Sequence, residues 1–427
     1  MKITRLFTIF LLATMLSSIA YARRAVFAGG GVDDANGEIY QTFLDLAAKV
    51  SPNPTILICT GASAPEDADE NAQFYIDILT KTFGAKNVIN LPINLNHPEG
   101  AYDQANLDLI ASAHGLFFGG GDQSRLYSLF FQNSTSGKVD TPALALIRQM
   151  YESDRLVLGG TSAGTAIMSA VPMITGGVSY ESFVHDPHPY IAGDESDDLT
   201  YQEDGGFGFF TLGFIDTHVG TRGRQGRDIR LVHWFPSTLT NLSFGVDEDS
   251  AIVLENDTFE VAGYNGVFIY DISEAISSDS KSKYWNLANV KVSYLTTGDK
   301  YDFRTNTVTF ASWKKDIRGN ERHDKPMEPK KDIFCWNTNE IFTNVTTNLF
   351  DSKETKTYGL SYQSNPEFRV DFEKREDSRG AIGTKGINEY ISYSNLYVNI
   401  YSSEGAMNQV DDIILRDDIA TTIKKFH

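Results

Sequence analysis

Short apolar runs alternate with helical periods along the first two thirds of the chain. Residues 25–28 are apolar enough for a buried strand, and Gly29-Gly30-Gly31 after them predicts a sharp turn. Between residues 38 and 50, apolar side chains recur at the spacing of one helical face. Because strands that alternate with helices pair in parallel and carry helices on both faces, this pattern predicts a doubly wound α/β domain with a mostly parallel sheet. The strand signal returns at residues 55–60, 116–118, 156–158 and 214–216.

The pattern changes near residue 291, where apolar and polar residues alternate with the period of two that is typical of strands. A charged stretch at residues 314–331, which contains two prolines, predicts an exposed loop or linker. We therefore expect a β-rich C-terminal extension over residues 306–427, after a first domain over residues 23–305. The extension shows no residues that indicate a chemistry. Its strand signals lie at residues 290–294, 307–310, 359–362, 368–372 and 396–401.

The first 22 residues have the composition of a secretory signal peptide. Lys2 and Arg5 precede an apolar run at residues 6–19, which ends in the cleavage-site pattern Ala20-Tyr21-Ala22. A membrane anchor is the alternative, but a spanning helix needs about 20 apolar residues and this run is shorter. We therefore expect a secreted or periplasmic protein that no membrane segment retains. Four N-x-S/T sequons are compatible with a secreted glycoprotein, and they begin at Asn133, Asn241, Asn256 and Asn344.

The charge balance limits the partners that the protein can bind. The chain has 37 basic and 56 acidic residues, and loss of Lys2 and Arg5 with the leader changes the formal charge from −19 to −21. A surface this acidic repels nucleic acid and anionic lipid, whereas it attracts a basic substrate or simply keeps the protein soluble. Cys59 lies in an apolar run, and we expect both it and Cys335 to be free thiols.

The strongest local motif is Gly160-Thr161-Ser162-Ala163-Gly164, which follows an apolar strand and precedes a helical start. A G-x-S-x-G pattern at a strand-to-helix turn exposes the serine hydroxyl, and its glycines avoid collisions between Cβ atoms and the neighbouring backbone. Ser162 is therefore the candidate nucleophile, and the Ala163 amide is a candidate donor to an oxyanion. The alternative is that small residues only permit a tight turn here.

A serine nucleophile needs a base, and the candidate is His218, which follows a strand-like run at residues 213–215. Three arginines follow this histidine at short intervals. Cations beside a base lower its pKa, so this arrangement is costly unless an anion is to be bound. We therefore expect Arg222, Arg224 and Arg227 to provide a clamp that holds a substrate carboxylate. At least one of them is expected to face the pocket, while another pairs with Asp216 or a neighbouring acid and holds the loop in shape.

The third member of a triad is a carboxylate that orients the histidine. A turn between two apolar runs offers Asp247, Glu248 and Asp249, and the residues alone leave the choice among them open. Glu181, just beyond the nucleophile helix, is a further alternative.

A second strand runs into a glycine turn at Gly119-Gly120-Gly121-Asp122-Gln123. Gly120 and Gly121 are candidates for a second amide that donates to an oxyanion. Gln123 adds a polar side chain to the same edge of the predicted sheet, where the functional loops of such folds lie.

Four motifs occur together in this chain: G-T-S-A-G, F-x-G-G-x-D-Q, D-x-H-x-x-x-R-G-R-x-x-R and G-V-D-E-D-S-A. With them the chain resembles cyanophycinase, a serine peptidase related to peptidase E, over residues 25–303. The resemblance implies an amidotransferase-like or flavodoxin-like fold and exopeptidase cleavage of cyanophycin, a polymer of aspartate with arginine on each β-carboxyl, into β-Asp-Arg dipeptides. It also implies a triad of Ser162, His218 and Glu248 without a cofactor. The positions that match the family's substrate pocket are Gln123, Asp216, Arg222, Arg224 and Arg227.

Two features depart from the family pattern. Thr217 stands where the family usually has glutamine, so one substrate hydrogen bond of the family is in question. Residues 186–205 form an acidic insertion that is either a lid over the site or a surface loop.

Other functions and ligands are either kept as alternatives or not expected. A dipeptidase that acts on short Asp-containing peptides is one alternative, and a secreted binding protein with weak catalysis is another. We expect no metal, because no cluster of His, Cys and carboxylates shows ligand spacing in the sequence. A nucleotide site at Gly29-Gly30-Gly31 is a weak alternative, since the G-x-G-x-x-G register is absent there. A homodimer is compatible with the sequence.

Overall fold

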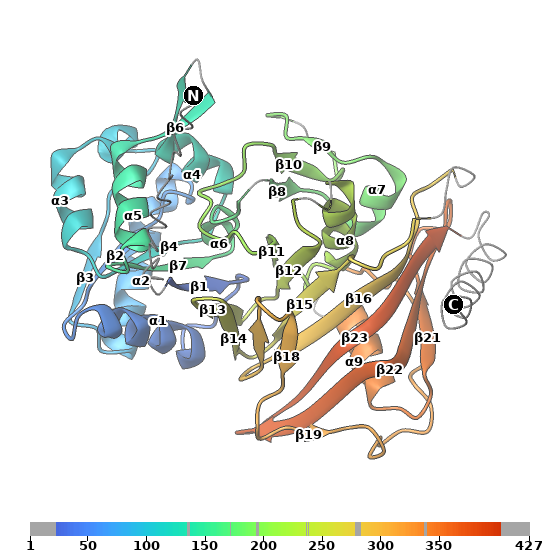
Figure 1. The fold of residues 1–427 in the computed structure, drawn as a ribbon. Coiled ribbons are helices and arrows are strands. Elements are labelled where there is room, and N and C mark those ends of the chain that lie inside the picture. The colour runs from blue at the N-terminus through green and yellow to red at the C-terminus, as the bar shows by residue number, and fades with distance from the viewer. Residues whose placement is uncertain are drawn as a thin grey trace, which may run out of the picture.

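The computed structural model describes residues 23–402 except 135–136, 171, 194–195, 236, 238, 278–282 and 337–339. The predicted signal peptide and the last part of the predicted extension therefore lie outside the described residues. Two large sheets build the molecule, one mainly in its blue-to-green part and the other mainly in its yellow-to-red part (Figure 1). Among the described residues, no helix has the length and apolar character that crossing a bilayer requires.

The first sheet has nine strands and contains the predicted parallel core. In chain order they are β1 (Arg24–Ala28), β2 (Thr55–Cys59), β3 (Asn87–Asn90), β4 (Gly115–Phe118), β7 (Val157–Thr161), β13 (Ser250–Glu255), β14 (Thr258–Gly263), β17 (Lys300–Asp302) and β18 (Thr307–Thr309). Their order in the sheet is β18-β17-β14-β13-β1-β7-β4-β2-β3. The five strands from β1 to β3 in this order pair in parallel, and the strands on the other side of β1 pair antiparallel.

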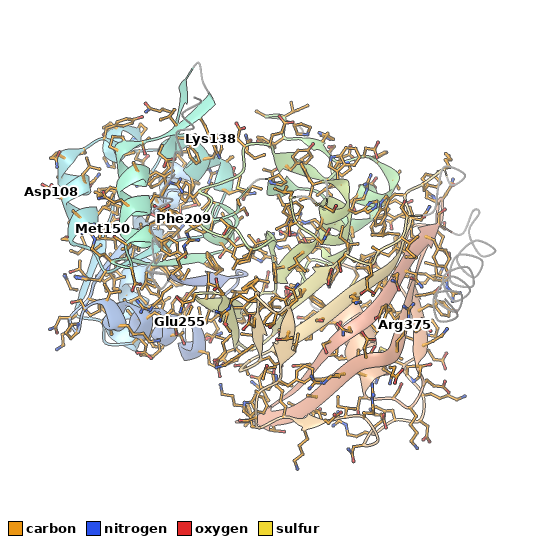
Figure 2. All side chains as sticks on the ribbon, in the orientation of Figure 1. Asp108, Lys138, Met150, Phe209, Glu255 and Arg375 are labelled. Carbon is orange, nitrogen blue, oxygen red and sulfur yellow. The ribbon has the colours of Figure 1, made fainter. Side chains whose placement is uncertain are left out.

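Helices cover both faces of the parallel strands, so the predicted doubly wound α/β class is confirmed. On one face, Phe43 of α1 packs against Val26 of β1. On the other face, Phe27 joins the core that α3, α4 and α5 bury, and burial of such a side chain contributes roughly 1.5–3 kcal/mol. The helical elements here are α1 (Gly37–Val50), η1 (Pro65–Asp67), α2 (Ala68–Asp77), η2 (Ile78–Thr82), η3 (Pro98–Ala101), α3 (Gln104–Ser112), α4 (Gln123–Phe130), α5 (Pro142–Glu152) and α6 (Ala163–Ala166). Figure 2 labels Met150 and Phe209, which are buried in this core, and Asp108, which is exposed.

The second sheet contains the long strands of the C-terminal half. Its strands are β11 (Phe214–Thr217), β12 (Leu242–Val246), β15 (Gly266–Asp271), β16 (Leu287–Thr296), β20 (Lys330–Lys331), β21 (Lys356–Leu360), β22 (Phe368–Lys385) and β23 (Asn388–Ser402), in the order β11-β12-β15-β16-β23-β22-β21-β20, with β19 (Lys315–Asp316) paired to β22. The period of two is visible in β15, where Val267 belongs to the first core and Phe268 to the second. Three helices bury the second core, and they are α7 (Ser179–Val184), α8 (Gln225–Trp234) and α9 (Ile341–Phe350).

One predicted strand takes a different place. The sequence pattern groups residues 214–216 with the doubly wound sheet, but β11 lies at the edge of the second sheet and pairs in parallel with β12. The reason is that both edges of β1 are occupied, by β7 and by β13, so the first sheet offers β11 no central position.

The predicted boundary at residue 305 falls between strands that share one sheet. β16 of the first segment pairs antiparallel with β23 of the C-terminal segment. Residues 306–402 therefore extend a sheet that begins before the boundary. Within them, the predicted loop at residues 314–331 contains only the two short strands β19 and β20.

Smaller sheets complete the fold. β5 (Phe131–Ser134) and β6 (Gly137–Asp140) form a hairpin. The insertion at residues 186–205 contributes β9 (His188–Pro189) and β10 (Thr200–Gln202), and β10 pairs with β8 (Met173–Gly176). Both cysteines are buried and neither is part of a disulfide, as the sequence predicts.

Candidate active site

Ser162 lies at the turn between β7 and α6, and its backbone is in the positive-φ region with φ 53° and ψ −119°. This conformation is unfavourable for serine and persists only where the surroundings impose it. Gly164 shows how tight the turn is, because a Cβ there would lie 2.2 Å from the Phe118 carbonyl oxygen. The strand-to-helix elbow expected from the motif is therefore present, and it exposes the Ser162 hydroxyl beyond the end of β7.

His218 bridges Ser162 and Glu248. Its Nε2 lies 2.7 Å from Ser162 Oγ, and its Nδ1 lies 2.6 Å from Glu248 Oε1. The histidine follows the last residue of β11, and its amide donates to the Gly29 carbonyl at 2.9 Å. Gly30 leaves room for the imidazole, since a Cβ at that position would lie 2.1 Å from the ring. The glycine turn after β1 thus shapes the site, a role that the sequence pattern alone did not reveal.

The structure distinguishes the three neighbouring acids by their partners. Asp247 is buried and accepts hydrogen bonds from the amides of Thr221 at 3.0 Å and Glu248 at 2.8 Å. Asp249 accepts from the amide of Asp33 at 2.6 Å. Glu248 is therefore the acid that contacts His218, whereas Asp247 holds together the two loops that carry the pair.

The chain shares most of its length with cyanophycinases. It is 30% identical over 287 residues to the cyanophycinase of Trichormus variabilis, which covers 66% of this chain and 85% of that protein. The chain belongs to the cyanophycinase family. It is also 29% identical over 293 residues to the cyanophycinase of Geminocystis herdmanii, with 67% of this chain and 96% of that protein covered. Family membership places the chain among peptidases, which are hydrolases.

Two further comparisons are less informative. No family model matches the chain. Among solved structures, the chain is similar to a peptidase from an acI-B1 Actinobacterium, with a TM-score of 0.40 and 18% identity over 58% of this chain and 91% of that one.

The three arginines of the cyanophycinase motif lie in different environments. Arg227 donates from Nε to Asp216 Oδ2 at 2.7 Å and from Nη2 to Asp216 Oδ1 at 2.6 Å, and both side chains are 4% exposed. Its Nη1 donates to the Gly177 carbonyl at 2.7 Å. All three nitrogens of this guanidinium are therefore engaged within the protein. We accordingly expect Arg227 and Asp216 to shape the pocket and not to bind substrate themselves.

Arg222 is the most accessible of the three. Arg224 is largely buried and donates from Nη1 to the Thr217 carbonyl at 2.9 Å. The side chain of Arg222 is 33% exposed, and its Nε lies 3.9 Å from Glu248 Oε1. Of the three arginines, Arg222 is therefore the accessible one at the edge of the site, and Arg227 is the one that pairs with Asp216.

The glycine turn after β4 lies beside the nucleophile. A Cβ on Gly120 would be 3.4 Å from the Cβ of Ser162, whereas a Cβ on Gly121 would meet the Ala62 carbonyl oxygen at 2.1 Å. Gly120 is thus nearer to Ser162 than Gly121 is, although its backbone also hydrogen-bonds Tyr75. Gln123 begins α4, and its Nε2 donates to the Thr175 carbonyl of β8 at 3.3 Å.

The electrostatic setting keeps the imidazole neutral. Burial and the charge of Arg222 lower the pKa of His218 to about 4, although the hydrogen bond to Glu248 opposes this shift. At neutral pH the histidine is therefore unprotonated and free to accept a proton. Burial disfavours the charge of Asp216, but Arg227 outweighs this effect and holds the pKa of Asp216 below its usual range.

The C-terminal segment also reaches the site, which sequence reasoning did not predict. The guanidinium carbon of Arg222 lies 5.7 Å from the ring centre of Trp336, whose side chain is 63% exposed. Burial and the charges of Asp247 and Glu248 raise the pKa of Glu340 to about 7. In the sequence this contribution is visible only as Trp336, which follows the charged stretch at residues 314–331 and belongs to no motif.

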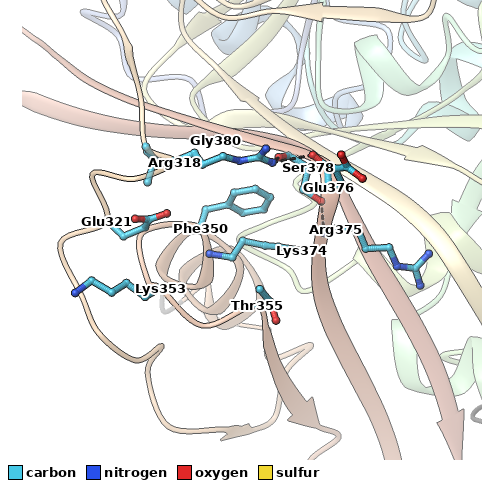
Figure 3. Close-up of a pocket in the computed structure, with 11 residues that line it drawn as sticks. Arg318, Glu321, Phe350, Lys353, Thr355, Lys374, Arg375, Glu376, Ser378 and Gly380 are labelled. Carbon is cyan, nitrogen blue, oxygen red and sulfur yellow. Dashed lines mark hydrogen bonds between the residues drawn. The ribbon is translucent and has the colours of Figure 1, made fainter.

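A separate cavity of about 390 Å³ lies in the C-terminal half (Figure 3). Several of its basic side chains bind backbone carbonyls: Arg318 donates to Glu376 at 2.9 Å, and Lys374 donates to Ser352 at 2.6 Å. The cavity contains neither the serine nor the histidine of the candidate site. We therefore place the chemistry at Ser162.

The sequence showed no metal-ligand cluster, but the structure assembles one away from Ser162. Ligand atoms of Glu181, His185 and Asp198 all lie within 4.8 Å of one another. Sequence spacing did not reveal the group because Asp198 belongs to the insertion, which folds back onto α7. Glu181 is therefore beside His185, and the alternative that placed it in the triad is not supported by the geometry.

Proposed function

We propose that this chain is a serine exopeptidase that hydrolyses cyanophycin, or related peptides with arginine on the β-carboxyl of aspartate, to dipeptides. The observation that carries the proposal is the hydrogen-bonded line from Ser162 Oγ through the His218 ring to Glu248. The names of the related cyanophycinases support the choice of substrate.

The geometry suits acyl transfer through a covalent intermediate. His218 Nε2 takes the Ser162 proton while Oγ forms a bond to the scissile carbonyl carbon. Glu248 holds the imidazole and stabilises its protonated form. The C–N bond then breaks, and the proton passes from His218 to the leaving amine. Water, deprotonated by His218, attacks the acyl-enzyme and releases the second product. Amides of Ala163 and Gly120 stabilise the oxyanion, an effect of roughly 3–4 kcal/mol per donor.

Charge supports a zwitterionic substrate of this kind. Arg222 is the accessible cation for a substrate carboxylate, and the formal charge of −19 on the whole chain attracts a substrate that carries guanidinium groups. We also propose that residues 1–22 direct export. N-terminal sequencing of the processed protein tests this, with Arg23 expected as the first residue.

Product analysis tests the proposed activity. The protein is incubated with cyanophycin and with matched α- and β-linked Asp dipeptides, and the products are identified by mass spectrometry. Release of β-Asp-Arg from the polymer supports the proposal. Cleavage of dipeptides alone favours the dipeptidase alternative, and binding without cleavage favours the binding protein.

As the pH is lowered, kcat/KM is expected to fall only at an unusually low pH. Because only neutral His218 accepts a proton, kcat/KM stays nearly constant as the pH falls from about 7 to about 5, and it halves near pH 4. Removing a nearby cation raises the pKa of His218, so Arg222→Leu moves this fall to higher pH. A wild-type fall near pH 6.5, the value of an unperturbed histidine, contradicts the expectation.

Trp336 is expected to position Arg222 for substrate. A cation held over an aromatic ring gains about 0.5–1 kcal/mol at an exposed site, so Trp336→Ala raises KM by roughly 2- to 5-fold with little change in kcat. In an Arg222→Leu background the same replacement has no further effect, since the partner is gone. Tyr362→Ala, an exposed aromatic elsewhere in the segment, is the control. Additive effects of the two replacements on KM contradict this coupling.

A further inference from the structure

A cluster of histidines and carboxylates lies where the insertion meets α7. Glu181 and His185 are one helical turn apart, and the His185 amide donates to the Glu181 carbonyl at 2.8 Å. His185 Nδ1 lies 2.5 Å from Asp198 Oδ1 and 3.6 Å from Glu181 Oε2. His188 Nε2 lies 3.8 Å from Asp198 Oδ2. Ligand atoms of Glu181, His185 and Asp198 thus lie within 4.8 Å of one another, and His188 lies beside Asp198.

The backbone holds this arrangement in place. The Val178 amide donates to the Asp197 carbonyl at 3.0 Å, and the His188 amide donates to the Leu199 carbonyl at 3.1 Å. Asp198 therefore sits between two anchored neighbours and faces α7. Because the backbone sets their separation, Glu181, His185 and Asp198 need little rearrangement to share one ion.

The chemistry of the cluster matches a divalent transition metal. Imidazole nitrogen and carboxylate oxygen are the usual protein ligands of zinc at 2.0–2.2 Å, so ligand atoms around the ion lie roughly 3–3.5 Å apart. The separations of 2.5 Å and 3.6 Å between His185 Nδ1 and the carboxylate oxygens of Asp198 and Glu181 bracket that spacing.

The charges at this point suit a cation. The carboxylates of Glu181 and Asp198 both approach His185 Nδ1, and a bound divalent cation neutralises the repulsion between them.

We propose that this cluster is a structural site for one zinc-like divalent ion, which fastens the insertion to α7. Its ligands are Glu181, His185 and Asp198. The site lies outside the Ser162 machinery, and the proposal does not rest on the peptidase function.

The site is connected to the arginine loop through the start of α7. Ser179 Oγ donates to the Gly223 carbonyl at 2.6 Å and accepts from the Gly226 amide at 3.0 Å. Gly177, whose carbonyl binds Arg227, packs against the backbone of Asp198 and Leu199. An ion that fixes Asp198 on α7 therefore also stabilises the segment that positions Arg227.

Zinc titration of the full chain tests the proposal. The protein is treated with EDTA, freed of chelator, and titrated with zinc chloride in competition with a chromophoric chelator. We expect one equivalent to bind with a micromolar or lower Kd, and His185→Ala and Asp198→Asn each to weaken binding at least 10-fold. His97→Ala is the control, since this exposed histidine lies 3.8 Å from a single acid, Glu99.

Thermal unfolding gives a second readout. Zinc is expected to raise the Tm of the wild type and of His97→Ala, but not that of His185→Ala, because only a folded site binds the ion. If His185→Ala does not fold, Glu181→Gln is measured in its place, because glutamine keeps the side-chain shape of glutamate. Absence of stoichiometric binding, or equal affinity in the cluster variants and the wild type, overturns the site and identifies any bound zinc as adventitious.

Discussion

Ser162→Ala is expected to lower kcat for peptide hydrolysis by about 10⁴-fold or more while the fold stays intact. The replacement removes Ser162 Oγ, the atom that lies 2.7 Å from His218 Nε2, so no acyl-enzyme forms. Loss of one hydroxyl at a partly buried turn costs under about 1 kcal/mol of unfolding free energy. Steady-state kinetics with purified β-Asp-Arg oligomers and thermal unfolding of both proteins measure the two effects.

A second serine provides the matched control. Ser169 is buried a few residues after the nucleophile, and its hydroxyl donates to the Ala166 carbonyl at 2.7 Å. Ser169→Ala keeps kcat near the wild-type value. If Ser162→Ala retains turnover in a preparation free of other peptidases, Ser162 is not the nucleophile.

Arg227→Leu is expected to destabilise the protein by about 3–5 kcal/mol. The change leaves the fully buried Asp216 carboxylate without its bidentate partner, and an unpaired buried charge is costly. Asp216 has a lowered pKa in the folded state, so the ion pair contributes stability above the unfolded pKa of about 3.9 and loses it as the pH falls further. The difference in unfolding free energy between variant and wild type therefore shrinks below about pH 4. Urea denaturation at pH 7 and pH 3 measures it.

Arg222→Leu separates pocket stability from substrate binding. This arginine is partly exposed and only 3.9 Å from one carboxylate, so its loss changes unfolding free energy by less than about 1 kcal/mol. We expect it to raise KM instead, because it is the accessible cation of the motif. If Arg227→Leu is as stable as the wild type but has a much higher KM, the roles assigned to Arg227 and Arg222 are reversed.

The C-terminal segment is part of the molecule that surrounds the site. The match to the Trichormus cyanophycinase spans 287 of the 427 residues, so about a third of the chain lies outside it. In the structure, β23 pairs with β16 and Trp336 lies beside Arg222. A truncation at residue 305 therefore exposes the edge of β16 and removes Trp336 from beside Arg222.

Local rules account for the part of the fold that the sequence predicts well. Apolar strands of four or five residues at β1, β2 and β4, followed by helical periods, indicate parallel strands because both faces must be covered. The elbow at Ser162 is also partly local, since a Cβ on Gly160 would lie 2.4 Å from the Gly164 carbonyl oxygen. Because these features depend mainly on residues close together in the chain, the pattern of apolar and small residues predicts them.

The choice of the acid needed tertiary structure. Three consecutive acids at residues 247–249 have nearly the same local surroundings, and only the family resemblance pointed to Glu248. The structure separates them through partners far along the chain: Asp247 binds the Thr221 amide, Asp249 binds the Asp33 amide, and Glu248 contacts His218. Backbone amides from distant loops thus decide which carboxylate remains for the imidazole.

The sequence by itself determined the α/β class, the serine elbow and the set of residues around it. Tertiary structure alone decided that β11 joins the second sheet, which arginine pairs with Asp216 and which stays accessible, and that the insertion returns Asp198 to α7. α9 is a further case, because its Thr- and Asn-rich sequence favours helix weakly and burial of Phe342 and Val345 stabilises it. The physical reason is common to all four: burial and long-range pairing depend on neighbours that chain order does not reveal.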